Sequence, residues 1–358
     1  MSRSRADRPG LCFVGPLAGQ KFGYVVTQAV RLSAHFREAG YSVTAVSASP
    51  NRYVRLLDIV STLIRERRRT EIVILHVYSG PSFVVEDIAS WIARRNGHRI
   101  IMLLHGGALP EFMQAYPRWT SRVIRRADAI VAPSAFLARE IRKRGLTCRI
   151  IPNVIDISQY PYRHRPSVKP RLFWMRTFHP IYNPLMAIRV AAQIRKTHPD
   201  VHLAMGGQDK GMEREVKRFA DDQGMRGAVT FPGFLDMAGK IREGGAADIF
   251  INTSHIDNMP VAVVEACAMG IPVVSTSVGG VPDLLTEGQS GLLTPDGDTD
   301  AMVAAIRRLC GDPGLAARLS ENGRRLAERS AWERVRVEWE DLFASLVSRQ
   351  ADSGLQVS

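Results

Sequence analysis

Cysteine is scarce in this 358-residue sequence, and a long apolar run is absent. The four cysteines, Cys12, Cys148, Cys267 and Cys310, lie far apart and lack the paired spacing of a zinc site. Free thiols in a reducing compartment are therefore the simplest interpretation. No apolar stretch reaches the roughly 20 residues that a membrane-spanning helix needs. The short apolar stretch after the basic N-terminus leads into a glycine loop, which favours a first strand over a signal peptide. We expect a cytoplasmic protein of two domains.

Acidic residues are scarce in the N-terminal half. Up to Arg165 there are 26 Lys and Arg against 11 Asp and Glu, a balance of +15, whereas the remainder has 22 against 24, a balance of −2. The excess gathers in residues 65–69, 122–126 and 139–144. Solvated helix faces are one interpretation, and attraction to anionic lipid or to an anionic acceptor is the other. No nucleic-acid-reading motif accompanies the charge, so we expect no nucleic-acid partner.

Short apolar runs, glycine loops and helical patterns follow one another in the N-terminal half. The run LCFVGPLAG (residues 11–19) precedes a helix predicted over 24–39, which is how a doubly wound parallel sheet opens. The dinucleotide pattern GxGxxG is absent, which argues against a nicotinamide enzyme. Strands are also predicted at Ile72–Val77 and Arg99–Leu104. His105 follows the second of these strands and is predicted to point into the crevice where such sheets bind ligands, unless it is a structural histidine.

The segment 160–170 contains three prolines and little apolar periodicity, so it is predicted to link two domains. A second sheet is predicted to begin at Arg171, with further strands at 201–205, 229–231 and 248–252. The predicted domains are residues 1–165 and 166–330. Residues 331–358 are predicted to form a helix that crosses back over the domain junction, followed by a polar, frayed tail.

The stretch 254–276 carries the most specific pattern in the chain. A polar loop leads to Pro260, a helix predicted to end at Gly270, and a buried strand. Free backbone N–H groups at the start of a helix form a ready anion site. Asp257 precedes this helix and Glu265 lies inside it, with seven residues between them. A rise of about 1.5 Å per residue places Glu265 roughly 7–8 Å past the first turn, which suits the hydroxyl groups beside a diphosphate.

This stretch resembles the signature of the family 4 glycosyltransferases, which are retaining enzymes of the GT-B fold. The matching residues are Asp257, the run 265–274 (EACAMGIPVV), the pair Gly279-Gly280 and the turn 287–293. The family usually has Glu at the first acidic position, so Asp257 is a departure. The resemblance implies an α/β protein of two facing Rossmann-like, doubly wound domains, with the active site in the interdomain cleft.

The resemblance also implies roles for particular residues. His105 would contact the transferred sugar, Asp257 would hold one of its hydroxyl groups, and Arg176 would bind the donor phosphates. Glu265 would accept hydrogen bonds from the nucleotide ribose. The other residues expected to bind the donor are Gly19, Lys21, Lys210, Phe234, Met259 and Pro260. The family's usual phosphate-binding Lys is missing near Asn183, and Lys210 or Lys21 would compensate.

No cofactor is expected, because the acidic pair Asp296 and Asp298 precedes a predicted helix and suits a cap better than a metal site. The expected activity is retaining, metal-independent transfer of a sugar from a nucleotide-diphosphate sugar to a hydroxyl acceptor: a glycan, a lipid-linked saccharide or a small molecule. Peripheral contact with an anionic membrane, at its inner face, is a further expected interaction. The alternatives are a nucleotide-sugar epimerase of the same fold and a non-catalytic nucleotide-sugar-binding protein.

Overall fold

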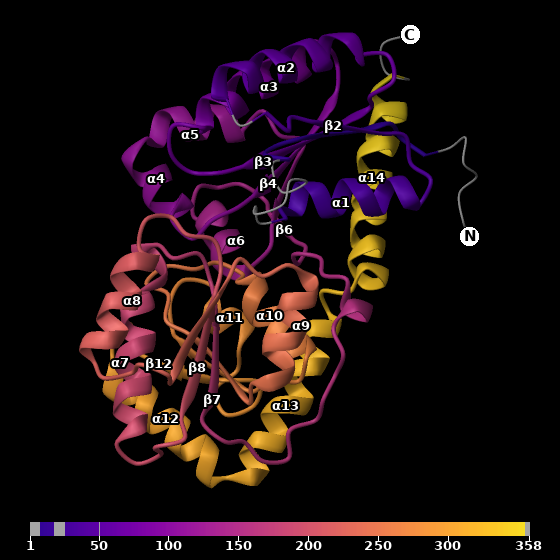
Figure 1. Cartoon of the computed structure of the whole chain (residues 1–358). Coiled ribbons are helices and arrows are strands. Elements are labelled where there is room, and N and C mark those ends of the chain that lie inside the picture. Colours follow the sequence, from indigo (N-terminus) through magenta and orange to yellow (C-terminus); the bar gives the residue numbers. More distant parts are fainter. Residues whose placement is uncertain (1–7, 18–25, 50, 355–358) are drawn as a thin grey trace. The chain divides into compact units, whose positions relative to one another are not determined.

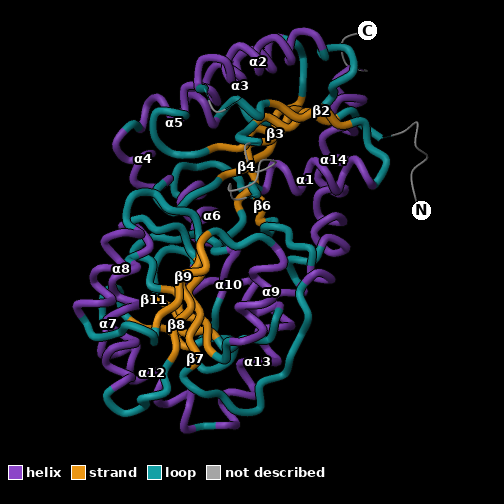
Figure 2. Tube along the Cα trace, viewed as in Figure 1, coloured by secondary structure: helices purple, strands orange, loops and turns teal. Residues whose placement is uncertain are grey.

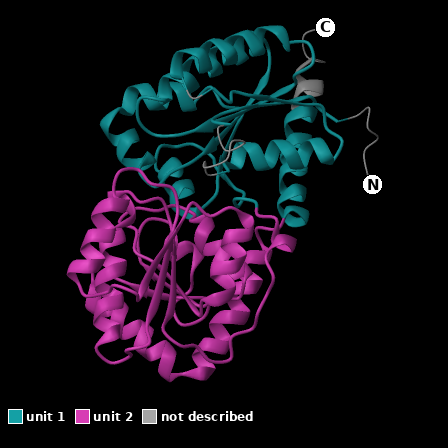
Figure 3. Cartoon of the chain, in the orientation of Figure 1, with its two compact units in different colours: residues 1–154, 332–358 teal, residues 155–331 magenta. Residues whose placement is uncertain are grey.

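The computed structural model describes residues 8–17, 26–49 and 51–354, with side chains as far as residue 348. The chain forms two compact units (Figure 3): unit 1 is Met1–Val154 with Trp332–Ser358, and unit 2 is Ile155–Ala331. The first unit therefore ends about ten residues earlier than the boundary predicted at residue 165. Among the described residues, no helix is long and apolar enough to cross a membrane.

Unit 1 contains a parallel six-stranded sheet in the order β2-β1-β3-β4-β5-β6. Its strands are β1 (Leu11–Val14), β2 (Val43–Val46), β3 (Ile72–Val77), β4 (Arg99–Leu104), β5 (Ala129–Ala132) and β6 (Arg149–Ile150). Its helices are α1 (Gln28–Glu38), α2 (Arg52–Arg65), α3 (Phe83–Arg95), α4 (Leu109–Ala115), α5 (Pro117–Ile124), α6 (Ala135–Arg142) and α14 (Trp332–Gly354). The predicted doubly wound arrangement is confirmed. Helix α1 begins later than predicted, because the Thr27 side chain caps it.

Both faces of this sheet are buried, because successive side chains of a strand point to opposite faces. In β1, Cys12 and Val14 pack on the side of α2, α3 and α6, whereas Leu11 and Phe13 pack on the side of α1 and α14. Trp339 of the C-terminal helix α14 is 1% exposed and lies in this second cluster. The C-terminal helix is thus part of the core of unit 1.

Unit 2 contains a second parallel sheet in the order β12-β11-β10-β7-β8-β9. Figure 2 draws its strands in orange between flanking helices. Its strands are β7 (Arg171–Met175), β8 (His202–Gly206), β9 (Val229–Gly233), β10 (Ile249–Asn252), β11 (Val273–Thr276) and β12 (Leu292–Thr294). Its α-helices are α7 (Pro184–Arg195), α8 (Glu213–Asp222), α9 (Met237–Ala246), α10 (Val261–Ala268), α11 (Val281–Leu284), α12 (Thr299–Gly311) and α13 (Pro313–Glu328). Two short 3₁₀ helices are η3 (Ile157–Gln159) and η4 (Pro180–Tyr182).

The strand order of unit 2 is that of a Rossmann sheet, with its topological switch point between β7 and β10. Leu172 and Trp174 of β7 pack on the side of α7, α8 and α12. Phe173 and Met175 pack on the opposite side, where α10 lies (Figure 1). Ligands of such sheets bind outside the carboxyl ends of the strands at the switch point, so the residues after β7 and β10 define the candidate site.

The segment 160–170 does not form an interdomain linker, because it packs into unit 2. Arg165 is 1% exposed, and its guanidinium donates hydrogen bonds to the backbone carbonyls of Arg163, Gly244, Ala247 and Met269. These carbonyls include the C-terminal ends of α9 and α10, where a cation is favoured. The prolines predicted an irregular backbone correctly but gave no sign of this burial.

Candidate functional site

Arg176 is the residue on which the candidate site of unit 2 is built, and it follows β7 at the switch point. Its Nε donates to Oδ1 of Asn252 (3.2 Å) and an Nη donates to Oγ of Ser254 (3.4 Å). The guanidinium also forms an ion pair with Asp257 and lies 4.6 Å from the centroid of the Tyr182 ring. Burial lowers the pKa of the Arg176 guanidinium, and the electrostatic interaction with Tyr182 offsets only part of this decrease. The result is an oriented cation at the carboxyl ends of two adjacent strands.

Glycines allow two loops to approach this cluster closely. A Cβ on Gly207 would lie 1.8 Å from the carbonyl oxygen of Arg176, and one on Gly279 would lie 2.0 Å from that of Asp257. Both residues also have positive φ angles, which glycine adopts at little cost. The N–H of Gly280 donates to the carbonyl of Asp257 at 3.1 Å. The downstream Gly-Gly pair therefore holds the Asp257 loop in place.

Glu265 lies on α10 and is 1% exposed. Its carboxylate accepts a hydrogen bond from Tyr160 Oη (2.7 Å) and contacts from Lys240 Nζ to both oxygens (2.8 and 2.7 Å). The Arg176 guanidinium is close enough for Glu265 to raise its pKa. The structure thus pairs Arg176 with Asp257 and places Glu265 within electrostatic reach of Arg176, whereas their roles in donor binding stay predictions. Neither Lys240, on α9, nor Tyr160 was predicted from the sequence.

The remaining predicted donor residues of unit 2 lie on loops at the carboxyl edge of the same sheet. Met259 is buried, and Pro260 is the N-cap of α10, so the helix begins at Val261, one residue after the predicted start at Pro260. Phe234 directly follows β9 and is half-buried. Lys210 is exposed in the loop after β8, where its backbone N–H donates to the carbonyl of Phe178. Each role in donor binding stays a prediction.

Asn183 occupies the position near which the family usually has a lysine, and it has a backbone role here. Its φ and ψ are 45° and 57°, in the left-handed region that Asn tolerates better than most residues. It joins η4 to α7, and its carbonyl accepts a hydrogen bond from Thr253 Oγ1 at 3.0 Å. This turn places Tyr182 over the Arg176 guanidinium.

The acidic pair before α12 is divided between two structural roles. Asp298 is the N-cap of α12, and its carboxylate accepts a hydrogen bond from the backbone N–H of Ala301 at 2.8 Å. Asp296 instead contacts Nδ1 of His255 at 2.7 Å. The predicted cap is confirmed for Asp298. Within the described part of the chain, no group of three or more His, Cys, Asp or Glu residues is placed to hold a metal ion.

His105 lies in unit 1, directly after β4, and belongs to a buried polar cluster. Its Nε2 is 2.8 Å from Nδ1 of His76 on β3, and the Tyr78 ring stacks on it at 4.8 Å. Burial lowers the pKa of His105 to about 3 and that of His76 well below its usual value, so both imidazoles are neutral. Glu86 of α3, which is 6% exposed, accepts from the Tyr78 backbone N–H at 3.4 Å. Burial raises the pKa of Glu86 to about 8.

His76 was not predicted, although it lies near the carboxyl end of a predicted strand. Hydrogen bonding between the two rings couples the tautomer of His105 to that of His76, because one nitrogen must donate and the other accept. A second histidine on the neighbouring strand was the available signal. Gly19 and Lys21 lie outside the described residues.

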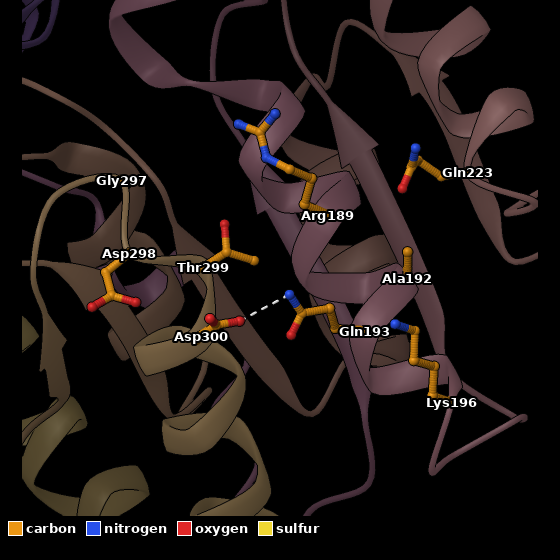
Figure 4. A pocket seen from close by; sticks show the side chains of 9 residues that line it. All are labelled: Arg189, Ala192, Gln193, Lys196, Gln223, Gly297, Asp298, Thr299 and Asp300. Carbon is orange, nitrogen blue, oxygen red and sulfur yellow. Dashed lines mark hydrogen bonds between the residues drawn. The ribbon is translucent and has the colours of Figure 1, made fainter.

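A cavity of about 570 Å³ lies between α7 and α12 (Figure 4). Its lining residues are Arg189, Ala192, Gln193, Lys196, Gln223, Gly297, Asp298, Thr299 and Asp300. The hydrogen bond from Gln193 to Asp300 (2.9 Å) crosses it. None of the residues predicted to bind the donor lines this cavity, so we do not assign it to the candidate site.

Two family profiles match adjacent parts of the chain. Residues 24–159 match Glycosyltransferase Family 4, and residues 164–326 match Glycosyl transferases group 1. The first match falls in the N-terminal part of the chain, which includes the histidine cluster. The second covers the strands and loops that carry Arg176, Asp257 and Glu265.

Curated relatives include a glycogen synthase and a D-inositol 3-phosphate glycosyltransferase. Over 242 residues the chain is 27% identical to a glycogen synthase of Mycobacterium tuberculosis, covering 64% of this chain and 56% of the relative. Over 162 residues it is 32% identical to a D-inositol 3-phosphate glycosyltransferase of Acidothermus cellulolyticus, covering 43% of this chain and 36% of the relative. The chain thus spans about half of the first relative and about a third of the second.

Solved structures share the fold across nearly the whole chain. Sucrose-phosphate synthase from Thermosynechococcus elongatus has a TM-score of 0.80 at 16% identity, covering 96% of this chain and 100% of that one. Anabaena HepE in complex with UDP-glucose has a TM-score of 0.73 at 19% identity, covering 94% of this chain and 100% of that one. These likenesses show the two-domain α/β architecture of the GT-B fold. With both family profiles matched in order along the chain, the protein belongs to the family 4 glycosyltransferases.

Proposed function

We propose that the protein transfers a sugar, with retention of anomeric configuration, from a nucleotide-diphosphate sugar to a hydroxyl acceptor. The observation that carries this proposal is the cluster of Arg176, Asp257 and Glu265 at the switch point of unit 2, beside the start of α10. The glycosyltransferase names of the relatives support it, as does the UDP-glucose complex of Anabaena HepE. A uridine nucleotide sugar is therefore the first donor to test.

Arg176 would stabilise the departing diphosphate. Its guanidinium is oriented by Asn252 and Ser254, and fixed donors aimed at developing charge need little rearrangement during the reaction. The first backbone N–H groups of α10 have no intrahelical partner and add positive potential at the same edge of the sheet. Lys240 neutralises the Glu265 carboxylate, which would otherwise repel the diphosphate.

Asp257 would hold a hydroxyl group of the transferred sugar, and Glu265 would accept a hydrogen bond from the ribose. Neither carboxylate is proposed as a covalent nucleophile, because one is paired with Arg176 and the other with Lys240. The bond from the anomeric carbon to the diphosphate breaks, and the acceptor oxygen bonds to that carbon on the same face. The acceptor proton passes to an oxygen of the leaving diphosphate. His105 would contact the sugar as a neutral imidazole.

No metal takes part in this scheme, since Arg176 and helical N–H groups supply the positive charge. We therefore expect turnover to survive EDTA. Loss of turnover on chelation, restored by Mg²⁺ or Mn²⁺, would contradict metal independence.

The activity is tested by incubating the protein with UDP-, GDP- and ADP-sugars and following donor and product by NMR. The expected product is a glycoside with the anomeric configuration of the donor. Isomerisation of the donor sugar without an acceptor would identify an epimerase instead. Donor binding with no reaction across a broad panel of acceptors would favour a binding protein.

A further inference from the structure

Helix α2 exposes large apolar side chains on one face. Tyr53, Val54, Leu57 and Ile64 are 65%, 53%, 70% and 53% exposed. At about 100° per residue these four positions lie within roughly a 100° arc of the helix. The opposite face holds Ile59, Thr62 and Leu63, which are at most 9% exposed, and packs on the unit 1 core beside α3 (Figure 1). Single exposed apolar residues are ordinary, but an aligned set marks an interaction surface.

Positive charge surrounds this apolar face. The stretch from Arg52 to Arg69 contains six arginines against Asp58 and Glu66, an excess of four positive charges. Arg67 and Arg68 directly follow α2, are exposed, and have no carboxylate within ion-pair distance among the described residues. Arg69 approaches Glu66 only at 3.9 Å, with 82% of its side chain exposed. Arg67, Arg68 and Arg69 are thus available to an external anion.

The other two basic clusters of unit 1 have charges that are paired with carboxylates of the protein. On α6, Glu140 pairs with Lys143 (2.6 Å) and Arg144 (3.6 Å), and the apolar Leu137 and Ile141 are fully buried. The cluster at 122–126 is engaged with an aspartate of α3, because Arg122 and Arg126 both contact Asp87. Sequence alone ranked these clusters equally, whereas of the three only the cluster at 65–69 adjoins a helix with several exposed, aligned apolar side chains among the described residues.

We propose that α2 and Arg67–Arg69 form a docking surface for an anionic phospholipid bilayer. Tyr53, Leu57 and Ile64 would enter the boundary between headgroups and acyl chains, and the arginines would bind lipid phosphates. A helix with one apolar face and basic flanks binds membranes in this way without crossing them. The charge favours a lipid surface over an uncharged apolar partner, because the exposed side chains of Arg67–Arg69 would be matched by anionic headgroups. The proposal is independent of the proposed transferase activity.

The test is co-sedimentation of the full chain with phosphatidylcholine vesicles containing rising phosphatidylserine, at low and high salt. We compare a charge variant (Arg67→Gln with Arg68→Gln), an apolar variant (Leu57→Ser with Ile64→Ser) and an α6 control (Lys143→Gln with Arg144→Gln). Wild type and control are expected to bind anionic vesicles in a salt-sensitive manner. The charge variant should bind roughly 30-fold more weakly, since each surface arginine contributes a factor of about five. The apolar variant should bind at least about tenfold more weakly, because two apolar side chains no longer enter the membrane interface.

Two outcomes would overturn the proposal. One is wild-type binding that is absent at every lipid composition, or α2 variants that bind like the control. The other is self-association of the wild type in sedimentation velocity that the apolar variant abolishes while vesicle binding is unaffected, because α2 would then be a contact between copies of this chain. Nucleotide-sugar binding by the same variants, measured by thermal shift, separates a docking defect from failure of the donor site or of folding.

Discussion

Arg176 binds the Asp257 carboxylate, so a donor diphosphate would have to share or replace that partner. We expect Asp257→Asn to strengthen binding of the free nucleoside diphosphate by roughly tenfold, about 1.4 kcal/mol, because the competing negative charge is removed. Turnover should fall at the same time, because the sugar loses a hydrogen-bond acceptor. Calorimetric titration and steady-state rates measure the two effects. Asp300→Asn, in the cavity between α7 and α12, is the matched control. Weaker nucleotide binding by Asp257→Asn would contradict the competition.

Buried titratable groups in unit 1 make the free energy of unfolding depend on pH, and they act in two opposite directions. His76 and His105 have lowered pKa values, so their contribution is present above the unfolded value of 6.5 and is lost as pH falls below it. Glu86 has a pKa raised from 4.5 to about 8, so it favours folding at low pH and that contribution is lost as pH rises between these values. Above pH 6.5, Glu86 therefore dominates among these three groups.

We expect unfolding free energy to fall by roughly 1.5 kcal/mol between about pH 6.5 and 8 through Glu86. Glu86→Gln keeps the shape of the side chain and removes its titration, so this decline should flatten in the variant. Urea unfolding at several pH values in this window provides the measurement. An equal slope in both proteins would show that Glu86 is not held neutral.

At the scale of elements, the turn between η4 and α7 depends on the left-handed backbone of Asn183. Asn183→Ala should cost about 1–2 kcal/mol of stability, the penalty of this conformation for a residue with an ordinary Cβ. Asn183→Gly should cost less, because glycine adopts positive φ freely. Thermal unfolding of both variants checks the order. If the glycine variant were the less stable one, the side chain rather than the backbone would be what matters there.

Elements with local signals were predicted well from the sequence. Helix α10 was predicted to end at Gly270, and the structure has Val261–Ala268 with Gly270 at a φ of 71°. Asp298 caps α12 as predicted, because a cap bonds to a residue only three positions away. Patterns within a few residues determine such features.

Contacts between distant segments could not be predicted in this way. Lys240 and Tyr160 reach Glu265 across 25 and 105 residues of sequence, and the fold alone brings them together. Arg165 was placed in a linker because prolines surround it, yet its burial depends on carbonyls at the ends of α9 and α10. The pairing of His76 with His105 likewise depends on the register of two neighbouring strands.

At the scale of the whole molecule, two doubly wound sheets each place polar groups at the carboxyl ends of adjacent strands. Unit 2 carries Arg176 and its carboxylate partners, whereas unit 1 carries neutral histidines and the basic, apolar face of α2. The positive excess of the chain lies in its N-terminal half. Binding of the sugar donor is thus proposed for unit 2, and docking to an anionic bilayer is proposed for unit 1.

The most direct test of the central claim is a thermal-shift measurement with UDP-, GDP- and ADP-sugars on wild type, Arg176→Ala and Arg189→Ala. Arg189 is the matched control, an exposed arginine of the same unit that lines the cavity between α7 and α12. A donor at about 100 times its Kd stabilises the folded protein by about 2.7 kcal/mol, so at least one sugar nucleotide should raise the Tm of wild type and of Arg189→Ala. Arg176→Ala should lose at least about two thirds of this stabilisation at the same donor concentration, because removing a charged hydrogen-bond partner costs at least ~2 kcal/mol of binding. A full ligand-induced shift in Arg176→Ala would contradict the assignment of the donor site.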